Sequence, residues 1–368
     1  MIAEIKNKKR IIIKIGSNIL IENNNIRTSW LESLAHDILY LRSLNKEVIL
    51  VSSGAIALGR GLIKTKNKLS LEEKQAACSI GQIDLIANYK AIFEKHNLNI
   101  AQILLTSYDS SHRQSYLNAK NTINTLIKNE IIPIINENDT VATEEISIGD
   151  NDRLAARVAQ MIDADLLILL SDIDGLYDKN PNLNKDAKFI DLIENIDENI
   201  KNMASGSISD IGSGGMTTKI KAAKMAFNCG CDTIITNGSQ ENSISNLLNG
   251  GRFSLFKSNQ KKIKSKKRWI LDDFRAKGEL IVNKNAVVAL KNGSSLLAVG
   301  VQMVVGKFEE GDHILIKDIN NKHIATGIAS YSSTNIKIIM GKNTNQIKEV
   351  FGLNIKEELV HRDNMVVV

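Results

Sequence analysis

The chain has 368 residues, more than a single hydrophobic core usually holds, so we expect two domains. Hydrophobic residues make up 43% of the chain and charged residues 24%, a balance typical of globular proteins, and no apolar run is long enough to span a membrane. The net charge of +6 accompanies a general enrichment in lysine, so by itself it does not indicate a nucleic-acid-binding protein. Three cysteines are too few for a disulfide scaffold and favour a cytoplasmic location.

Short β-branched strands alternate with helical patterns from residue 10 to about residue 250. The expected strands are 10–16, 47–54, 99–106, 131–139, 165–175 and 231–238, and the expected helices are 28–45, 71–97, 115–130, 151–164 and 217–230. This βαβ alternation predicts an α/β fold with an open, mainly parallel sheet.

Polar and glycine-rich residues lie at the carboxyl ends of four of these strands. They are Gly16-Ser17-Asn18, Ser52-Ser53-Gly54, Asn136 to Asp139, and Ser171-Asp172. The carboxyl ends of parallel strands meet at one edge of the sheet, where open α/β sheets bind their ligands. We therefore expect the functional site at this edge.

The pattern changes near residue 278 to short apolar runs separated by Asn, Gly and Asp turns, which predicts a small β-barrel or sandwich. We divide the chain into a first domain at 1–255, a basic linker at 256–277 and a second domain at 278–368. Within the linker, residues 257–268 include seven basic residues. They form either a solvated linker or a nucleic-acid-binding patch.

Two positions carry charge where the pattern is otherwise apolar or helical. Lys14 lies within the strand IIIKIGS, where an ammonium group is costly unless it reaches solvent or an anion; the following Gly16 favours a phosphate partner. Asn151 and Asp152 begin a helix. One of them is explained as an N-cap, but together they could also hold an ammonium group or a Mg²⁺-bound water.

The stretch GSGGMTTKIKAAK, residues 212–224, precedes a helical pattern. It is either a flexible surface loop or a loop whose backbone amides bind an anion at a helix N-terminus, with Lys219 in the first turn. The histidines show no metal-ligand spacing, and nothing in the sequence indicates zinc or a covalent nucleophile.

The chemistry-bearing segments fall in the order KIGSNIL, VSSGAIALG, PIINENDTVAT, IGDNDRLAA, LLSDIDGLY and GSGGMTTKIKAA, followed by KRWILDDF, GSSLLAVGV and VHRDNMVVV. Taken together they resemble the amino acid kinase family, and within it the glutamate-phosphorylating members that end in a PUA domain. The resemblance covers nearly the whole chain. It implies an amino acid kinase-like sheet with helices on both faces, plus a small β-barrel-like PUA domain.

The resemblance also assigns roles to residues. It implies that Lys14 and Lys219 stabilise the transferred phosphoryl group and that Asp152 holds both lysines. The positions that match the glutamate-binding residues are Ser53, Gly54, Asn136, Asp139 and Asn151. The positions that match the ATP-binding residues are Lys14, Ser171, Asp172, Ser213, Gly214, Gly215, Met216, Thr217, Thr218 and Lys219.

The implied reaction is ATP-dependent phosphorylation of the L-glutamate side-chain carboxylate, the first step of proline biosynthesis, with Mg²⁺ as cofactor and no dedicated protein metal site. The implied partners are glutamate, ATP, further copies of the chain in a dimer or tetramer, proline as a feedback inhibitor and glutamyl phosphate reductase. Two alternatives stay open: an enzyme of this fold with a different carboxylate substrate, and an RNA-binding PUA protein.

Overall fold

The computed structural model describes residues 7–64, 69–141, 151–181, 183–205, 215–258, 276–352 and 357–367. The chain forms two compact units, Met1–Ser110 with Gln114–Lys262, and Ile263–Val368 with Ser111–Arg113. Each unit has its own hydrophobic core. Among the described residues, no helix combines the length and the apolar character needed to cross a membrane.

Within the described residues, the first unit is built on an eight-stranded sheet with the order β10-β12-β11-β7-β1-β4-β6-β5. Its strands are β1 (Arg10–Ile15), β4 (Glu47–Ser52), β5 (Ile100–Leu105), β6 (Ile132–Glu137), β7 (Leu166–Ser171), β10 (Leu192–Ile193), β11 (Asp232–Asn237) and β12 (Phe253–Phe256). The strands from β11 to β5 are parallel, and β12 runs antiparallel to β11. The part of this unit that the structure describes also has two small hairpins outside the sheet: β2 (Ile21–Glu22) with β3 (Asn25–Ile26), and β8 (Leu176–Tyr177) with β9 (Phe189–Ile190).

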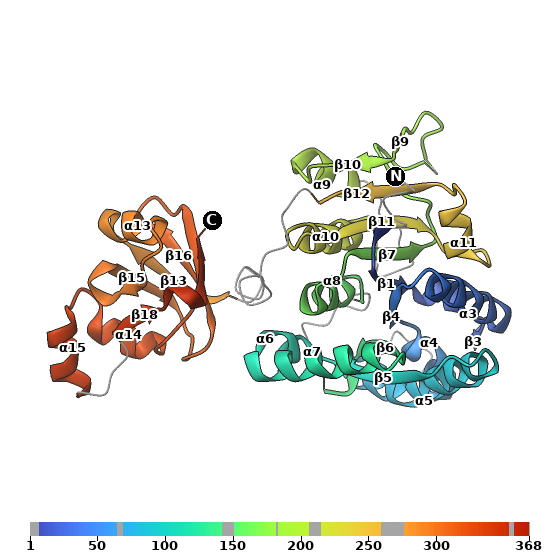
Figure 1. Ribbon diagram of the computed structural model, residues 1–368, viewed down its shortest axis with the longest axis horizontal. Coiled ribbons are helices and arrows are strands. Elements are labelled where there is room, and N and C mark those ends of the chain that lie inside the picture. The colour runs from blue at the N-terminus through green and yellow to red at the C-terminus, as the bar shows by residue number, and fades with distance from the viewer. Residues whose placement is uncertain are drawn as a thin grey trace. The chain divides into compact units, whose positions relative to one another are not determined.

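Helices cover both faces of the sheet, with α3 and α11 on one face and α8 and α10 on the other (Figure 1). The longer helices are α3 (Thr28–Ser43), α5 (Leu71–Lys95), α7 (Arg113–Lys128), α8 (Asn151–Ile162), α9 (Glu198–Ser205) and α10 (Met216–Phe227). The shorter ones are α2 (Ser17–Leu20), α4 (Ala55–Gly59), α6 (Ser107–Ser111), α11 (Ser243–Leu248), and the 3₁₀ turns η1 (Arg60–Leu62) and η2 (Asp139–Val141).

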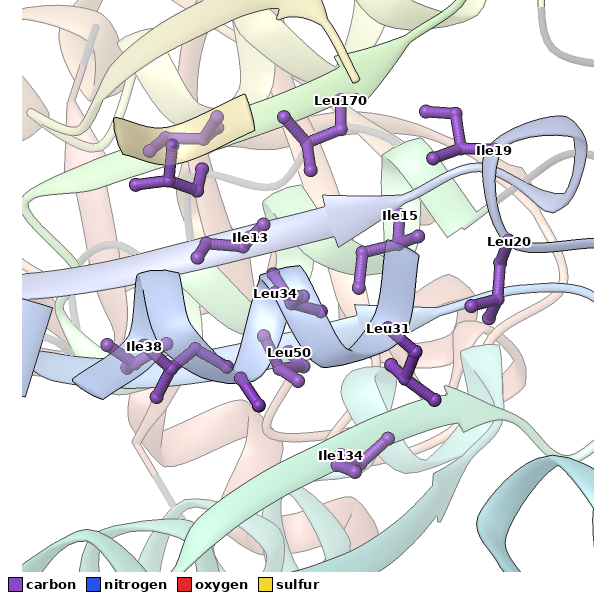
Figure 2. Packing of buried hydrophobic residues seen from close by; sticks show 14 of the residues in the cluster. Ile13, Ile15, Ile19, Leu20, Leu31, Leu34, Ile38, Leu50, Ile134 and Leu170 are labelled. Carbon is purple, nitrogen blue, oxygen red and sulfur yellow. The ribbon is translucent and has the colours of Figure 1, made fainter. Parts of the chain in front are cut away.

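The alternation of side chains along β1 separates the core from the site. Ile13 and Ile15 join a buried cluster in which Leu31, Leu34 and Ile38 of α3 lie over β1 and β4 (Figure 2). Because successive side chains of a strand point to opposite faces, Lys14 between the two isoleucines points to the face covered by α8.

Helix α5 is fixed at its start and in its middle. Ser70 and Glu73 form a capping box, with each side chain bonded to the other residue's backbone amide. One turn further along, α5 packs against α4 through glycines: a Cβ at Gly59 would lie 1.9 Å from the Ala77 carbonyl oxygen, and one at Gly81 would lie 1.9 Å from the Ala55 oxygen. The absence of side chains at both positions lets the two helix backbones touch.

The second unit carries a five-stranded sheet, among the described residues, in the order β15-β13-β16-β17-β19. These strands are β13 (Ala276–Val282), β15 (Val301–Gly306), β16 (His313–Asp318), β17 (His323–Ile328) and β19 (Met365–Val367), and β14 (Leu296–Leu297) pairs separately with β18 (Glu358–Val360). The unit also holds α13 (Lys284–Lys291), α14 (Ser333–Ile339), α15 (Thr344–Phe351) and the 3₁₀ turns η4 (Ala298–Gly300) and η5 (Arg362–Asn364).

The predicted fold class is confirmed, with a large, mostly parallel sheet between helices and a separate unit of small sheets. The elements that were not predicted include the short helices of the first unit, the hairpins β2-β3 and β8-β9, the strands β10 and β12, and the short helices of the second unit. Each is at most eight residues long, too short for a periodic pattern to show clearly.

Candidate active site

The predicted site residues gather at the carboxyl ends of the central strands. From β1 the chain passes to β4 on one side, and after β6 it returns to place β7 on the other side of β1. Such a reversal of strand order opens a ligand-binding position at the carboxyl edge of an α/β sheet. Helices α8 and α10 both begin at this edge.

A two-lysine centre, formed by Lys14, Lys219 and Asp152, lies at the reversal. The Lys14 ammonium is 2.6 Å from Asp152 Oδ1, and the Lys219 ammonium donates to Asp152 Oδ2 over 3.5 Å. Asp152 is fully buried, and the two lysine side chains are only 7–8% exposed. Two positive groups and one carboxylate leave the centre with one excess positive charge, which suits an anionic ligand.

The electrostatics of the centre keep Asp152 ionised. Burial by itself would raise the pKa of this carboxyl. The charges of the Lys14 and Lys219 ammonium groups, with hydrogen bonds from Lys14 and Thr218, outweigh burial and hold the pKa below its usual value. For Lys219, burial is the largest effect and lowers its pKa, which the Asp152 carboxylate only partly offsets. The free site thus holds Lys219 less firmly in its charged form than a surface lysine.

Thr218 connects the start of α10 to the same carboxylate. Its hydroxyl lies 3.0 Å from Asp152 Oδ2 and 2.8 Å from the backbone oxygen of Gly215, the residue that precedes α10. Contacts to one carboxylate therefore fix the first turn of α10 relative to α8.

The amide cluster, formed by Ser53, Asn136, Asn151 and Gln82, lies beside this centre. The Asn151 amide nitrogen is 2.7 Å from Ser53 Oγ, 2.9 Å from the Ser52 carbonyl oxygen and 3.0 Å from Asn136 Oδ1. Because Asn151 and Asp152 are consecutive at the start of α8, the cluster and the two-lysine centre share one helix N-terminus.

Gln82 was not predicted from the sequence. Its side-chain oxygen accepts a hydrogen bond of 2.7 Å from Asn136 Nδ2, and Asn136 Oδ1 also accepts the Glu137 amide. Gln82 lies in the middle of α5, 54 residues before Asn136, in a helical pattern that carries no sign of a site.

Asp139 lies in η2, next to a different residue of α5. The Cys78 thiol donates to Asp139 Oδ2 over 2.9 Å. Burial raises the pKa of the Asp139 carboxyl, and the hydrogen bond from Cys78 works against that rise. Burial likewise raises the pKa of the Cys78 thiol, so it is present as the neutral donor.

Gly54 makes the bend between β4 and α4. Its φ of +109° lies in a region that favours glycine, and a Cβ there would be 2.8 Å from Ile21 Cγ1. A glycine is therefore required directly after Ser53.

The residues expected to bind ATP lie partly within the described structure. Ser171, at the end of β7, donates to the carboxylate of the exposed Asp172, which in turn acts electrostatically on Lys219. Gly215 precedes α10, Met216 is buried and Thr217 is exposed. Ser213 and Gly214 lie outside the described residues.

The described residues contain no group of three or more His, Cys, Asp or Glu side chains placed to hold a metal ion. Both oxygens of Asp152 face ammonium groups. The centre is arranged to stabilise negative charge with fixed cations, and the adjoining cluster offers neutral hydrogen-bonding groups to a second ligand.

The sequence matches the amino acid kinase family over residues 9–237 and the PUA domain over residues 278–351. It is 46% identical to a glutamate 5-kinase of Pelagibacter ubique, across 99% of this chain and 100% of that protein. It is 44% identical to a glutamate 5-kinase of Paramagnetospirillum magneticum, across 97% of each chain.

Among solved structures, a UMP kinase from Ureaplasma parvum matches 68% of this chain and 99% of its own, with a TM-score of 0.51 and 18% identity. At that identity the likeness concerns the fold alone. With the family match covering most of the chain and full-length relatives well above 40% identity, the chain belongs to the amino acid kinase family and, within it, to the glutamate 5-kinases that carry a PUA domain.

Proposed function

We propose that the chain transfers the γ-phosphoryl group of ATP to the side-chain carboxylate of L-glutamate, giving L-glutamyl 5-phosphate and ADP. The observation that carries this proposal is the pair of buried lysines that share one carboxylate beside the amide cluster. The chain that holds them is related to glutamate 5-kinases over its full length. The full-length relatives do not favour the two alternatives, a different carboxylate substrate or a solely RNA-binding role.

The acceptor needs no general base. A glutamate side chain has a pKa of about 4.3 and is ionised at neutral pH. One of its carboxylate oxygens attacks the γ-phosphorus, the bond from that phosphorus to the bridging oxygen of ADP breaks, and the bonding electrons leave with ADP. The difficulty is the approach of one anion to another, so catalysis requires positioned positive charge.

Lys14 and Lys219 would supply that charge. Each ammonium is held within 3.5 Å of Asp152, so both are oriented before a ligand arrives. In the transition state the excess charge of the two-lysine centre would stabilise the phosphoryl oxygens, while Asp152 limits the mutual repulsion of the lysines. Gly215, the first turn of α10 and the segment at Ser171 and Asp172 would hold the remainder of ATP.

The acceptor site would be formed by Ser53, Asn136, Asn151 and Asp139. Gly54, which has no side chain, would let the ligand approach the backbone closely. The amides and hydroxyl suit the carboxylates of glutamate, and the half-buried Asp139 carboxylate suits its α-ammonium group. Selectivity for a free amino acid would thus depend on Asp139.

Mg²⁺ would enter with ATP and neutralise charge on its phosphates. Mg²⁺ in such sites is held largely by substrate phosphates and water, so ATP itself would supply most of the ligands of the ion. Oligomer formation, inhibition by proline, coupling to a glutamyl phosphate reductase and a cytoplasmic location stay predictions from the family.

The test is a substrate panel with ATP and Mg²⁺, scored by ADP release and by hydroxylamine trapping of the acyl phosphate. L-Glutamate should give a trapped hydroxamate, while N-acetylglutamate, which lacks the ammonium group, and aspartate should react far more slowly. A panel in which another acid is preferred, or in which no hydroxamate forms with glutamate, would refute the proposal.

A further inference from the structure

One turn of α5 contacts the acceptor side of the site through three side chains. Cys78 donates to Asp139 over 2.9 Å, Ser79 Oγ lies 3.0 Å from Thr140 Oγ1, and Gln82 accepts from Asn136 over 2.7 Å. Cys78 and Gln82 are four residues apart, so they lie on the same face of the helix.

This turn belongs to a rigid support. The Gly59–Gly81 contact fixes the α5 backbone against α4 directly beside Gln82, and α4 follows Ser53 and Gly54 in the chain. Helix α5 therefore contacts both the segment that follows β4 and the segment that follows β6.

Each contact constrains a group in a way that suits ligand binding. A hydrogen bond from a neutral thiol to a half-buried carboxylate favours its charged form and fixes its orientation. The amide of Asn136 has two orientations related by a flip. The Glu137 backbone amide, which donates to Oδ1, selects the one that places Oδ1 toward Asn151, and Gln82 stabilises this orientation by accepting from Nδ2.

We propose that the turn Cys78–Gln82 is a positioning element of the acceptor site, in which Cys78 orients Asp139 and Gln82 orients Asn136, so that α5 sets the affinity for the amino acid acceptor. The proposal rests on the proposed function, because Asp139 and Asn136 are acceptor-binding residues only if that function holds. Neither Cys78 nor Gln82 contacts the two-lysine centre in any described interaction, so the turn acts on acceptor binding and not on phosphoryl transfer.

The test compares four variants with the wild-type chain. Cys78→Ala removes the thiol donor, Cys78→Ser keeps a donor, and Gln82→Met keeps the length of the side chain but removes its acceptor. Ile83→Ala is the matched control, because Ile83 follows Gln82 on α5 and is 69% exposed. For each protein, kcat, the KM for glutamate and for ATP, the Kd for glutamate by calorimetry, and the Tm are measured.

Loss of one hydrogen bond should raise the KM and Kd for glutamate roughly three- to tenfold in Cys78→Ala and in Gln82→Met. The kcat and the KM for ATP should stay within about twofold, as a pure positioning role for the acceptor requires. Cys78→Ser should restore glutamate binding, and Ile83→Ala should match the wild type.

Unchanged glutamate KM and Kd in both variants would overturn the inference, as would a parallel loss of kcat, ATP affinity and Tm, which indicates a merely structural role. The proposed function is judged separately by the wild-type chain alone. If the wild type prefers another acceptor, the same variants are compared on that acceptor, and a selective rise in its KM still supports the role of α5.

Discussion

Lys14 and Lys219 come from opposite ends of the first unit's sequence, yet both ammonium groups contact the one carboxylate of Asp152. A single lysine in a buried strand would be costly, and two close together would repel each other. Asp152 makes both tolerable without neutralising them. At this scale, charge balance explains why Lys14 can lie between buried isoleucines in β1.

Lys219→Ala removes one of the two cations that would contact the transferred phosphoryl group. We expect kcat to fall by about two orders of magnitude or more, since electrostatic stabilisation of a transition state commonly contributes that much. Lys221→Ala is the control, because Lys221 is exposed on the same helix. Steady-state turnover and circular dichroism of both variants provide the check; if turnover of Lys219→Ala equals that of Lys221→Ala, Lys219 has no part in the reaction.

The lowered pKa of Lys219 predicts the alkaline side of the pH profile. Because burial favours the neutral form of Lys219, the free enzyme should lose this charge at a pH below the ordinary lysine pKa of about 10.4. As the charge is lost with rising pH, kcat/KM for ATP should fall. Lys219→Arg keeps the charge at all accessible pH values, so its activity, though lower, should not fall in this range. Identical alkaline limbs in the two proteins would assign the fall to another group.

At the scale of elements, the site depends on where helices begin. The N-terminus of α8 supplies Asn151 and Asp152, and the first turn of α10 supplies Thr218 and Lys219. These starts could be predicted, because polar residues precede clear helical periodicity. The role of α5 could not, because Cys78 and Gln82 form their contacts only after a helix and a strand distant in sequence have packed together.

The contact between α4 and α5 predicts a large difference between two nearby glycines. A methyl group at Gly59 would meet the Ala77 carbonyl oxygen at 1.9 Å, whereas one at Gly61 would meet nothing within 4 Å. Gly59→Ala should therefore lower the free energy of unfolding by at least about 2 kcal/mol, and Gly61→Ala should change it by less than about 0.5 kcal/mol. Urea unfolding of the two variants measures the difference, and equal stabilities would show that α4 can move away from α5.

For the whole molecule, the change in sequence pattern near residue 278 predicted two kinds of domain, because alternation of strands and helices gives way to short runs between turns. The grouping of particular residues at the site was harder to predict. Strand ends indicated the edge of the sheet at which the structure brings these residues together. The grouping of Asp152 with Lys14 and Lys219 came instead from the resemblance to a family, since residues 14, 152 and 219 have no local relation in the sequence. Tertiary packing determines which residues distant in the sequence become neighbours, and the periodicity of the sequence carries no information about that packing.

All described residues of the two-lysine centre and the amide cluster belong to the first unit, whose hydrophobic core contains no residue of the second unit. A chain ending at Lys262 should therefore fold and keep the KM values for glutamate and ATP within about threefold of those of the full chain. Kinetics of the truncated and full-length proteins, with Tm values for both, provide the measurement. The described residues of the first unit supply every group that we assign to the acceptor site. A truncated protein that folds but binds glutamate far more weakly would therefore contradict this assignment and mean that the PUA domain contributes to glutamate binding.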